Sequence, residues 1–281
     1  MGHSMSTKPR SLRVAVLSCG DLGDAVAREL GRVPGVGRVA LVTAPYVRKP
    51  LSLVAKMRHV YRAQGPTGLL AVLAAKLRGT HAPPPHDTNG GVASGVERHH
   101  FSDFHDPDCL ATLRAFAPDL GVVAGTYILK ETVFSIPRLG SINLHSGKAP
   151  EYRGAAPAFW ELYNGEREVG ITIHRVATAL DAGDILLQET FPLDPAPVED
   201  PLGYLERYRR EVLRPNGVRL LAQTVAQIAT GRVSERPQDP ARAQTYRTPD
   251  YRAIRELRRR VAARRLERAG VGVGTGLGEA S

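Results

Sequence analysis

The chain has 281 residues, two cysteines and a formal net charge of +10. This length is enough to bury a full hydrophobic core, as one large domain or as one domain with an extension. Two cysteines are too few for a disulfide scaffold or a thiolate zinc site, and no apolar run reaches the roughly 18 residues that a membrane span needs. We therefore expect a cytoplasmic protein with no membrane partner, and the excess positive charge hints at an anionic partner.

The first half of the chain alternates short apolar runs with helical spacing, a pattern that is typical of a parallel sheet. Strands are predicted over 11–20, 38–43 and 96–101, and helices follow the first and the third of them. Between the second and third strands, residues 50–79 read as two basic amphipathic helices and residues 80–95 as a loop rich in proline and glycine.

The second half begins with two strongly apolar strands, over 119–125 and 140–145. A helix is predicted to start near Pro157 and to end at Gly165, and two later strands are joined through "ATALDA" at 177–182. The rest reads as helix over 199–231 with a break or kink at Pro215, Asn216 and Gly217, a basic helix over 249–269, and a glycine-rich tail that we expect to be disordered.

Two motifs of the first half carry only weak functional signals. Gly20 and Gly23 follow the first strand, where dinucleotide-binding folds hold phosphate, but the full G-x-G-x-x-G pattern is absent and a tight turn is the better interpretation. The segment "HHFSDFHD" (99–106) contains three histidines and two aspartates, yet His99 and His100 would point to opposite faces of a strand. We therefore predict no nucleotide cofactor at the glycines and no metal site.

Positive charge is concentrated near the end of the chain. Ten arginines lie between Arg242 and Arg268, against the three acidic residues Asp250, Glu256 and Glu267. Such a segment could contact nucleic acid, but solvated arginine-rich helices are common and no recognisable nucleic-acid module accompanies it. The sequence therefore does not favour nucleic acid as a partner.

The stretch "INLHSGKAPEYRG" (142–154) carries a stronger signal. Asn143 and His145 have the same parity on a predicted strand, so both face one way at the carboxyl end, where open α/β sheets bind ligands. Histidine can donate or relay a proton near neutral pH, and an asparagine amide can stabilise an oxyanion. Asp181, in "LDAGDIL", could hold the imidazole charged. From the residues alone, catalysis and simple capping of the strand end are about equally supported.

Residues 142–189 resemble the core of the formyltransferases that use 10-formyltetrahydrofolate, a family that acts on methionyl-tRNA, glycinamide ribonucleotide and nucleotide sugars. Four motifs in the family's order carry the resemblance: Asn143-x-His145, Pro150 to Gly154, Gly170-x-Thr172 and Asp181-x-Gly183. The similarity covers residues 118–190 strongly and 11–117 loosely.

This resemblance implies an α/β fold with a Rossmann-like, mostly parallel sheet flanked by helices, and the residue patterns add a helical insertion and a mainly helical C-terminal extension. The predicted division is a tag remnant and disordered start over 1–10, a formyltransferase domain over 11–195 with the insertion at 47–95, a helical extension over 196–269 and a disordered tail over 270–281. The insertion could cover the active site or mediate dimerisation, which leaves a homodimer open.

The resemblance also implies the site and its chemistry. Its catalytic residues would be Asn143, His145 and Asp181, and no metal would be involved. Residues Tyr127, Ile128, Leu129, Ala177 and Asp181 would contact the folate. An acceptor amine would attack the formyl carbon, Asn143 and protonated His145 would donate to the oxyanion, and Asp181 would orient His145 and help to remove the amine proton.

We expect the acceptor to contact Lys148, Tyr152 and Arg153. Many relatives have Pro-Ser-Leu-Leu after the histidine, whereas this chain has "SGKA" at 146–149. Lys148 therefore either faces an anionic group of the acceptor or is simply solvated.

The acceptor itself is less constrained. Enzymes that act on tRNA carry a barrel-like C-terminal domain, whereas residues 195–281 read mainly as helices. We predict an N-formyltransferase for a small-molecule amine, such as an amino sugar or an amino-acid or natural-product amine. The alternatives are a methionyl-tRNA formyltransferase-like enzyme, a non-catalytic folate-binding module, and a formyltetrahydrofolate hydrolase, whose usual N-terminal regulatory module is not seen in this sequence.

Overall fold

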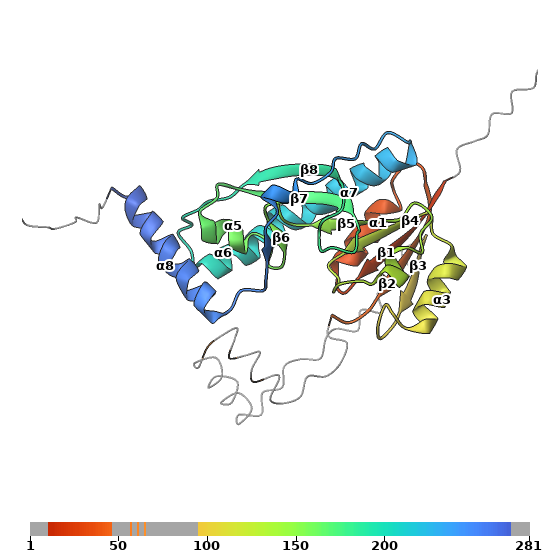
Figure 1. Cartoon of the computed structure of the whole chain (residues 1–281), viewed down its shortest axis with the longest axis horizontal. Helices are drawn as coiled ribbons and strands as arrows, with labels where there is room; N and C mark the ends of the chain where they lie inside the picture. The colour runs from red at the N-terminus through yellow and green to blue at the C-terminus, as the bar shows by residue number, and fades with distance from the viewer. Residues whose placement is uncertain (1–10, 47–56, 58–60, 62–64, 66–94, 271–281) are drawn as a thin grey trace, which may run out of the picture.

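A seven-stranded sheet forms the centre of the molecule (Figure 1). The structure is a computed structural model that describes residues 11–46, 57, 61, 65 and 95–270. The predicted start at 1–10, most of the predicted insertion at 47–95 and the predicted tail from residue 271 lie outside the described residues.

The sheet has the strand order β3-β2-β1-β4-β5-β7-β8. Its strands are β1 (Leu12–Ser18), β2 (Val36–Thr43), β3 (Val96–His100), β4 (Leu120–Ala124), β5 (Ser141–His145), β7 (Glu168–Arg175) and β8 (Ile185–Pro192). Strands β1 to β5 run parallel to one another, whereas β7 is antiparallel to both β5 and β8. This arrangement confirms the predicted Rossmann-like α/β class.

Helices cover both faces of the sheet because the central strands are apolar on both sides. Val14 and Val16 of β1 face the cluster formed with α1 (Leu22–Leu30) and α7 (Arg214–Ala229). Ala15 and Leu17 face the opposite cluster, which includes α3 (Pro107–Phe116) and the short α4 (Glu131–Phe134). Consecutive residues of one strand therefore stabilise two separate layers.

Strand β5 uses the same alternation to separate its core from its polar residues. Ile142 and Leu144 belong to the cluster under α1 and α7, so Asn143 and His145 project from the other face. On α7, Gly217 lies so close that a Cβ atom there would be 3.1 Å from the Leu144 side chain. The glycine thus lets α7 pack directly behind the strand that carries the two polar residues.

The helical segment predicted over 199–231 is interrupted, but the predicted location was wrong by about one turn. Helix α6 (Pro201–Tyr208) leads into a π-helical turn, Arg209–Leu213, and α7 begins directly after it. Pro215 has no N–H group, and its ring would clash with the carbonyl of Glu211 in a regular helix. The wider π turn before the proline accommodates it, and the helix continues through Gly217.

Between α7 and α8 (Tyr251–Arg268) the chain returns to the sheet, which the sequence did not predict. Arg236 forms an antiparallel bridge with Ile185, and the short strand β9 (Thr245–Tyr246) pairs with β6 (Arg153–Gly154). Such two-residue strands carry no detectable periodicity. The division between a domain and an extension at 195 stays a prediction, although Leu205 and Leu220 belong to the same hydrophobic cluster as β1.

Helix α8 is attached to α5 (Phe159–Asn164) through its arginines. Arg264 donates hydrogen bonds to the main-chain carbonyls of Leu162 (2.9 Å), Tyr163 (2.9 Å) and Pro195 (2.6 Å). The Arg260 guanidinium donates to the Tyr163 carbonyl at 3.3 Å and lies 4.1 Å from the centre of its ring. The last carbonyls of a helix have no partner within it, so these arginines act as a C-terminal cap for α5.

Replacing Arg264 by methionine should destabilise the protein, because three carbonyls lose charged donors. We expect Arg264→Met to lower the free energy of unfolding by about 2–3 kcal/mol, measured by urea denaturation. The matched control Arg252→Met changes an exposed arginine of the same helix and should stay within about 0.5 kcal/mol of the wild type. Equal losses in the two variants would contradict the capping role.

Candidate active site

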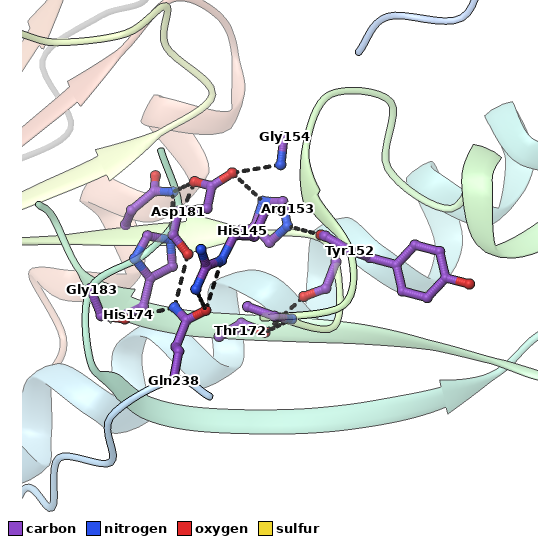
Figure 2. A network of polar contacts seen from close by, with 12 residues as sticks. His145, Tyr152, Arg153, Gly154, Thr172, His174, Asp181, Gly183 and Gln238 are labelled. Atoms are coloured by element: carbon purple, nitrogen blue, oxygen red, sulfur yellow. Dashed lines mark hydrogen bonds and ion pairs between the residues drawn. The ribbon is translucent and has the colours of Figure 1, made fainter. Parts of the chain in front are cut away.

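Three polar side chains meet at the carboxyl end of β5 (Figure 2). Asn143 and His145 project from β5, and Asp181 from the loop between β7 and β8. The Asn143 Nδ2 atom donates to Asp181 Oδ1 at 3.2 Å, and His145 Nδ1 lies 3.4 Å from Asp181 Oδ2. The side chains of His145 and Asp181 are only 9% and 8% exposed. The structure therefore brings together the three residues that the sequence motif singled out.

The Asp181 carboxylate is buried and charged. Its Oδ2 atom accepts a hydrogen bond from the Gly154 main-chain N–H at 2.8 Å, in addition to the bond from Asn143 to Oδ1. Burial alone would raise the pKa of Asp181, but the hydrogen bond with His174, the charges on His145 and His174 and the Gly154 N–H outweigh burial and lower it to about 2. Asp181 is therefore fully ionised at neutral pH.

Two glycines leave room for this arrangement. Gly154 has a φ of +96°, and a side chain there would collide with the main-chain oxygen of Tyr246. A side chain on Gly183 would collide with the main-chain oxygen of Arg175. Close backbone packing thus accounts for the glycine of the Arg-Gly motif and for that of the Asp-x-Gly motif.

Both ring nitrogens of His145 face hydrogen-bond acceptors. Nε2 lies 2.6 Å from the Tyr152 carbonyl oxygen, and Nδ1 faces the Asp181 carboxylate. A neutral imidazole would direct one lone pair at an acceptor, whereas an imidazolium satisfies both. Burial lowers the pKa of His145, while the Asp181 charge and the Tyr152 carbonyl oppose that shift. Burial is the largest of these effects, so the pKa of His145 lies below its ordinary value, and the Asp181 carboxylate limits that shift.

A second histidine, His174, belongs to the same cluster and was not predicted. It is the register partner of Asn143 on β7, and its Nε2 atom lies 3.1 Å from Asn143 Nδ2 and 3.4 Å from Asp181 Oδ1. Its Nδ1 atom lies 2.7 Å from the Arg175 carbonyl oxygen, so it carries the donated hydrogen. His174 and Thr172 are two residues apart, so strand alternation places them on the same face of β7. Which residues of β5 they lie beside depends on the register between the two strands, which the sequence does not show.

Thr172 fixes the turn that follows His145. It is the register partner of His145, and its hydroxyl donates to the Gly147 carbonyl at 2.7 Å. The same oxygen accepts hydrogen bonds from Ala149 N (3.2 Å) and Gln188 Nε2 (2.8 Å). The threonine of the Gly-x-Thr motif thus holds the "SGKA" turn against β7 and β8.

Comparisons with known proteins find similarity to formyltransferases. Residues 87–210 match the family model described as formyl transferase. Over 173 residues the chain is 39% identical to the methionyl-tRNA formyltransferase of Moorella thermoacetica, covering 61% of this chain and 53% of that protein. The chain spans about half the length of the curated relatives that it matches.

The chain is therefore similar to formyltransferases over its central part, residues 87–210. Its fold is shared with glycinamide ribonucleotide transformylase 1 from Symbiobacterium toebii, at 20% identity and a TM-score of 0.53, over 83% of this chain and 96% of that one. A sugar N-formyltransferase from a Shewanella species aligns with a TM-score of 0.53 at 14% identity, over 89% of this chain and 87% of that one. At these identities the likeness concerns the fold alone.

The residues predicted to contact the acceptor lie near the candidate site, and each has a partner in the protein. Lys148 Nζ forms an ion pair with Glu168 at 2.7 Å. The Tyr152 ring stacks on Tyr246, with ring centres 5.3 Å apart, and its carbonyl faces His145. The Arg153 guanidinium donates to the Gln238 side-chain oxygen, from Nε at 3.0 Å and from Nη2 at 2.7 Å.

The predicted folate contacts divide into buried and exposed side chains. The Tyr127 hydroxyl donates to Asp103 at 2.8 Å, which turns this side chain towards the start of α3, and Leu129 is buried. Ile128 is 70% exposed, and Ala177 is also exposed. Tyr127 and Val176 pack against one hydrophobic cluster, so the loop after β4 adjoins the loop after β7.

Two cavities border the candidate site. The larger, of about 310 Å³, is lined by Lys148, Glu151, Tyr152, Glu166, Glu168, Gln244 and Tyr246. The smaller, of about 10 Å³, includes His145, Trp160 and Glu161 in its lining and has room for about one water molecule.

Within the described ranges, the histidines and glycines that the sequence offered in the first half have ordinary structural contacts. No group of three or more histidine, cysteine, aspartate or glutamate side chains there could hold a metal ion. Instead His99 contacts Glu97, and His100 contacts Thr43. At Gly23 a side chain would collide with Ser18, so helix packing explains that glycine. Among the same residues, no helix has both the length and the apolar character needed to cross a membrane.

Glu161 was missed by sequence reasoning and is the most unusual carboxyl group beside the site. It is 2% exposed, and its Oε1 atom has no hydrogen-bond partner among the described residues. Burial raises the pKa of Glu161 to about 8, so the group is mainly protonated at neutral pH. Sequence reasoning could not detect this, because a glutamate in the first turn of a helix is ordinarily a solvated residue.

The raised pKa predicts a pH-dependent stability. Folding binds the Glu161 proton more tightly, so its contribution is fully present below pH 4.5 and is lost as the pH rises towards 8. We expect the free energy of unfolding of Glu161→Gln to exceed that of the wild type by on the order of 4 kcal/mol at pH 8, and by much less at pH 5. Urea denaturation at both pH values measures the difference, and an equal effect at the two pH values would refute it.

Proposed function

We propose that this chain transfers the formyl group of 10-formyltetrahydrofolate to an amine of a small-molecule acceptor. The arrangement of Asn143, His145 and Asp181 carries the proposal, with the carboxylate 3.2 Å from the amide nitrogen and 3.4 Å from the ring nitrogen. An amide N–H and an imidazolium on one strand face are the donors that a formyl oxygen needs as it becomes an oxyanion. The buried carboxylate orients the imidazole and stabilises its charged form against the effect of burial.

The loop after β5 must move for this chemistry. The Tyr152 carbonyl accepts the proton on His145 Nε2, at 2.6 Å. A formyl oxygen that takes the same proton has to replace this carbonyl. The loop over 146–152 would therefore shift when the reactants bind.

The loops after β4 and β7 fit a folate. Ile128 and Ala177 expose apolar atoms on two loops that pack on one hydrophobic cluster, and Leu180, 42% exposed, precedes Asp181. Such exposed apolar atoms beside a catalytic carboxylate suit a flat pterin ring. The folate, when bound, supplies the activated formyl group, and these residues would hold it next to His145.

The larger cavity supports a small, polar acceptor. Its lining combines the cation Lys148 with the carboxylates Glu151, Glu166 and Glu168. A mixture of charges fits an amine that also carries hydroxyl or carboxylate groups, such as an amino sugar or an amino acid. The volume of about 310 Å³ is at the lower end of the range for small-molecule sites.

Methionyl-tRNA is a second candidate acceptor, because the Moorella relative at 39% identity carries that name. The basic helix α8 does not add to this candidate. Arg264 and Arg260 donate to main-chain carbonyls, while Arg258 and Arg268 pair with Asp200 and Asp194. Arginines engaged in this way have less capacity to bind phosphates, which supports the small acceptor.

Removing either donor should slow formyl transfer. We expect Asn143→Ala and His145→Ala to lower kcat by about 10²–10³, measured as tetrahydrofolate formation. The matched control His100→Ala changes an exposed histidine of β3 that pairs with Thr43, and it should keep wild-type kcat. Near-normal transfer by His145→Ala would eliminate the proposed mechanism.

The acceptor can be identified with a panel. The full chain is incubated with 10-formyltetrahydrofolate and, separately, with amino sugars, nucleotide-linked amino sugars, amino acids and methionyl-tRNA. Formylation of a small amine is the expected result. Formylation of methionyl-tRNA alone would establish the second candidate. Release of formate without any acceptor would indicate a hydrolase, and folate binding without turnover would indicate a binding module.

A further inference from the structure

The segment between α7 and α8 bonds to both loops of the candidate active site. Arg236 and Ile185 exchange two main-chain hydrogen bonds, at 2.9 and 2.8 Å, beside the Asp181 loop. The Gln244 carbonyl accepts from Arg153 N at 3.0 Å, beside the loop that follows His145. Residues between these two anchors therefore span the space between the loops.

Gln238 lies between the anchors and uses its whole amide group (Figure 2). Nε2 donates to the carbonyls of Asp181 (2.8 Å) and Gly183 (2.7 Å). Oε1 accepts from Arg153 Nε (3.0 Å) and Nη2 (2.7 Å). Carbonyls only accept and a guanidinium only donates, so the orientation of the amide is determined by its partners. All four hydrogen-bonding positions of the side chain are filled.

These bonds act on the residue whose position matters most for His145. Asp181 has a φ of +50°, a conformation that few residues other than glycine adopt without support from their surroundings. Gln238 holds its carbonyl, and the Gly154 N–H holds its carboxylate. Gly154 directly follows Arg153, which is also bound to Gln238. One side chain thus connects the Asp181 main chain with the segment that binds the Asp181 side chain.

We infer that Gln238 is a positioning residue that keeps the Asp181 carboxylate against His145 and fixes the Asp181 loop relative to the Arg153 loop. Gln238 reaches the cluster through main-chain carbonyls and a guanidinium, so it acts through Asp181 and not on the reacting atoms. The residue lies outside the region that matches the family model, 87–210. Its catalytic meaning rests on the proposed function, but its effect on His145 does not.

The test measures the titration of the His145 ring by NMR in the full-length chain without ligands. The titratable or charged side chains that face the His145 ring are those of Asp181, His174 and Arg153. We expect Gln238→Met to lower the pKa of His145 by about one unit, because the Asp181 carboxylate moves away and burial is less opposed. Gln223→Met, a control at an exposed glutamine of α7, should leave the titration unchanged. An unchanged titration in Gln238→Met overturns the inference.

A double-mutant cycle separates positioning from a general loosening of the structure. In the Asp181→Asn background the carboxylate charge is gone, so adding Gln238→Met should cause no further shift. The same shift in both backgrounds overturns the inference. Gln238→Asn is one methylene shorter and cannot reach both loops. If Gln238→Met does not fold, Gln238→Asn allows the same comparison of His145 titrations with a milder change.

The two proposals can fail independently. A shifted titration in Gln238→Met, with no formyl transfer by the wild type to any amine, would reject the proposed function and keep the positioning role. Formyl transfer by the wild type, with no shift of the His145 titration in Gln238→Met, would keep the proposed function and reject the positioning role. If both hold, Gln238→Met should lose about tenfold or more in kcat with little change in KM for the folate.

Discussion

The candidate active site depends on keeping one charged carboxylate out of water. Burying an ion is costly unless donors replace the water that it loses. Asp181 obtains its donors from β5, from β6 and from the imidazoles on β5 and β7. No two neighbouring residues could supply them all, so separate parts of the chain must converge on this oxygen pair. The sheet order places β7 beside β5, and the loop after β7 brings the carboxylate back to the β5 face.

Strand alternation explains why much of the site could be predicted from the sequence. Asn143 and His145 are two residues apart on a strand whose other face is buried, so their common direction follows from the pleat. The glycines of the family motifs could likewise be recognised, since each one marks a close backbone contact. The strands of the main sheet were predicted for a different reason, because apolar runs of five to eight residues are typical of buried strands.

Contacts between distant segments could not be predicted in this way. His174 required the register between β5 and β7, and Gln238 required the return of a loop with only two-residue strands. Glu161 appeared to be an ordinary helix residue, because its burial comes from tertiary packing. The proline in the helical segment was recognised, but its effect appears one turn earlier than predicted, where the backbone has room to widen.

The arginines that attach α8 to α5 change what the formal charge of +10 means. Arg264 and Arg260 donate to main-chain carbonyls, and other arginines of the helix lie beside carboxylates. These guanidiniums use N–H groups within the protein, so they have fewer donors left for direct hydrogen bonds to the phosphates of a polyanion. Contacts between a guanidinium and a half-buried carbonyl are also poorly reached by mobile ions. The attachment of α8 should therefore persist at ionic strengths that dissociate proteins bound to nucleic acid through their arginines.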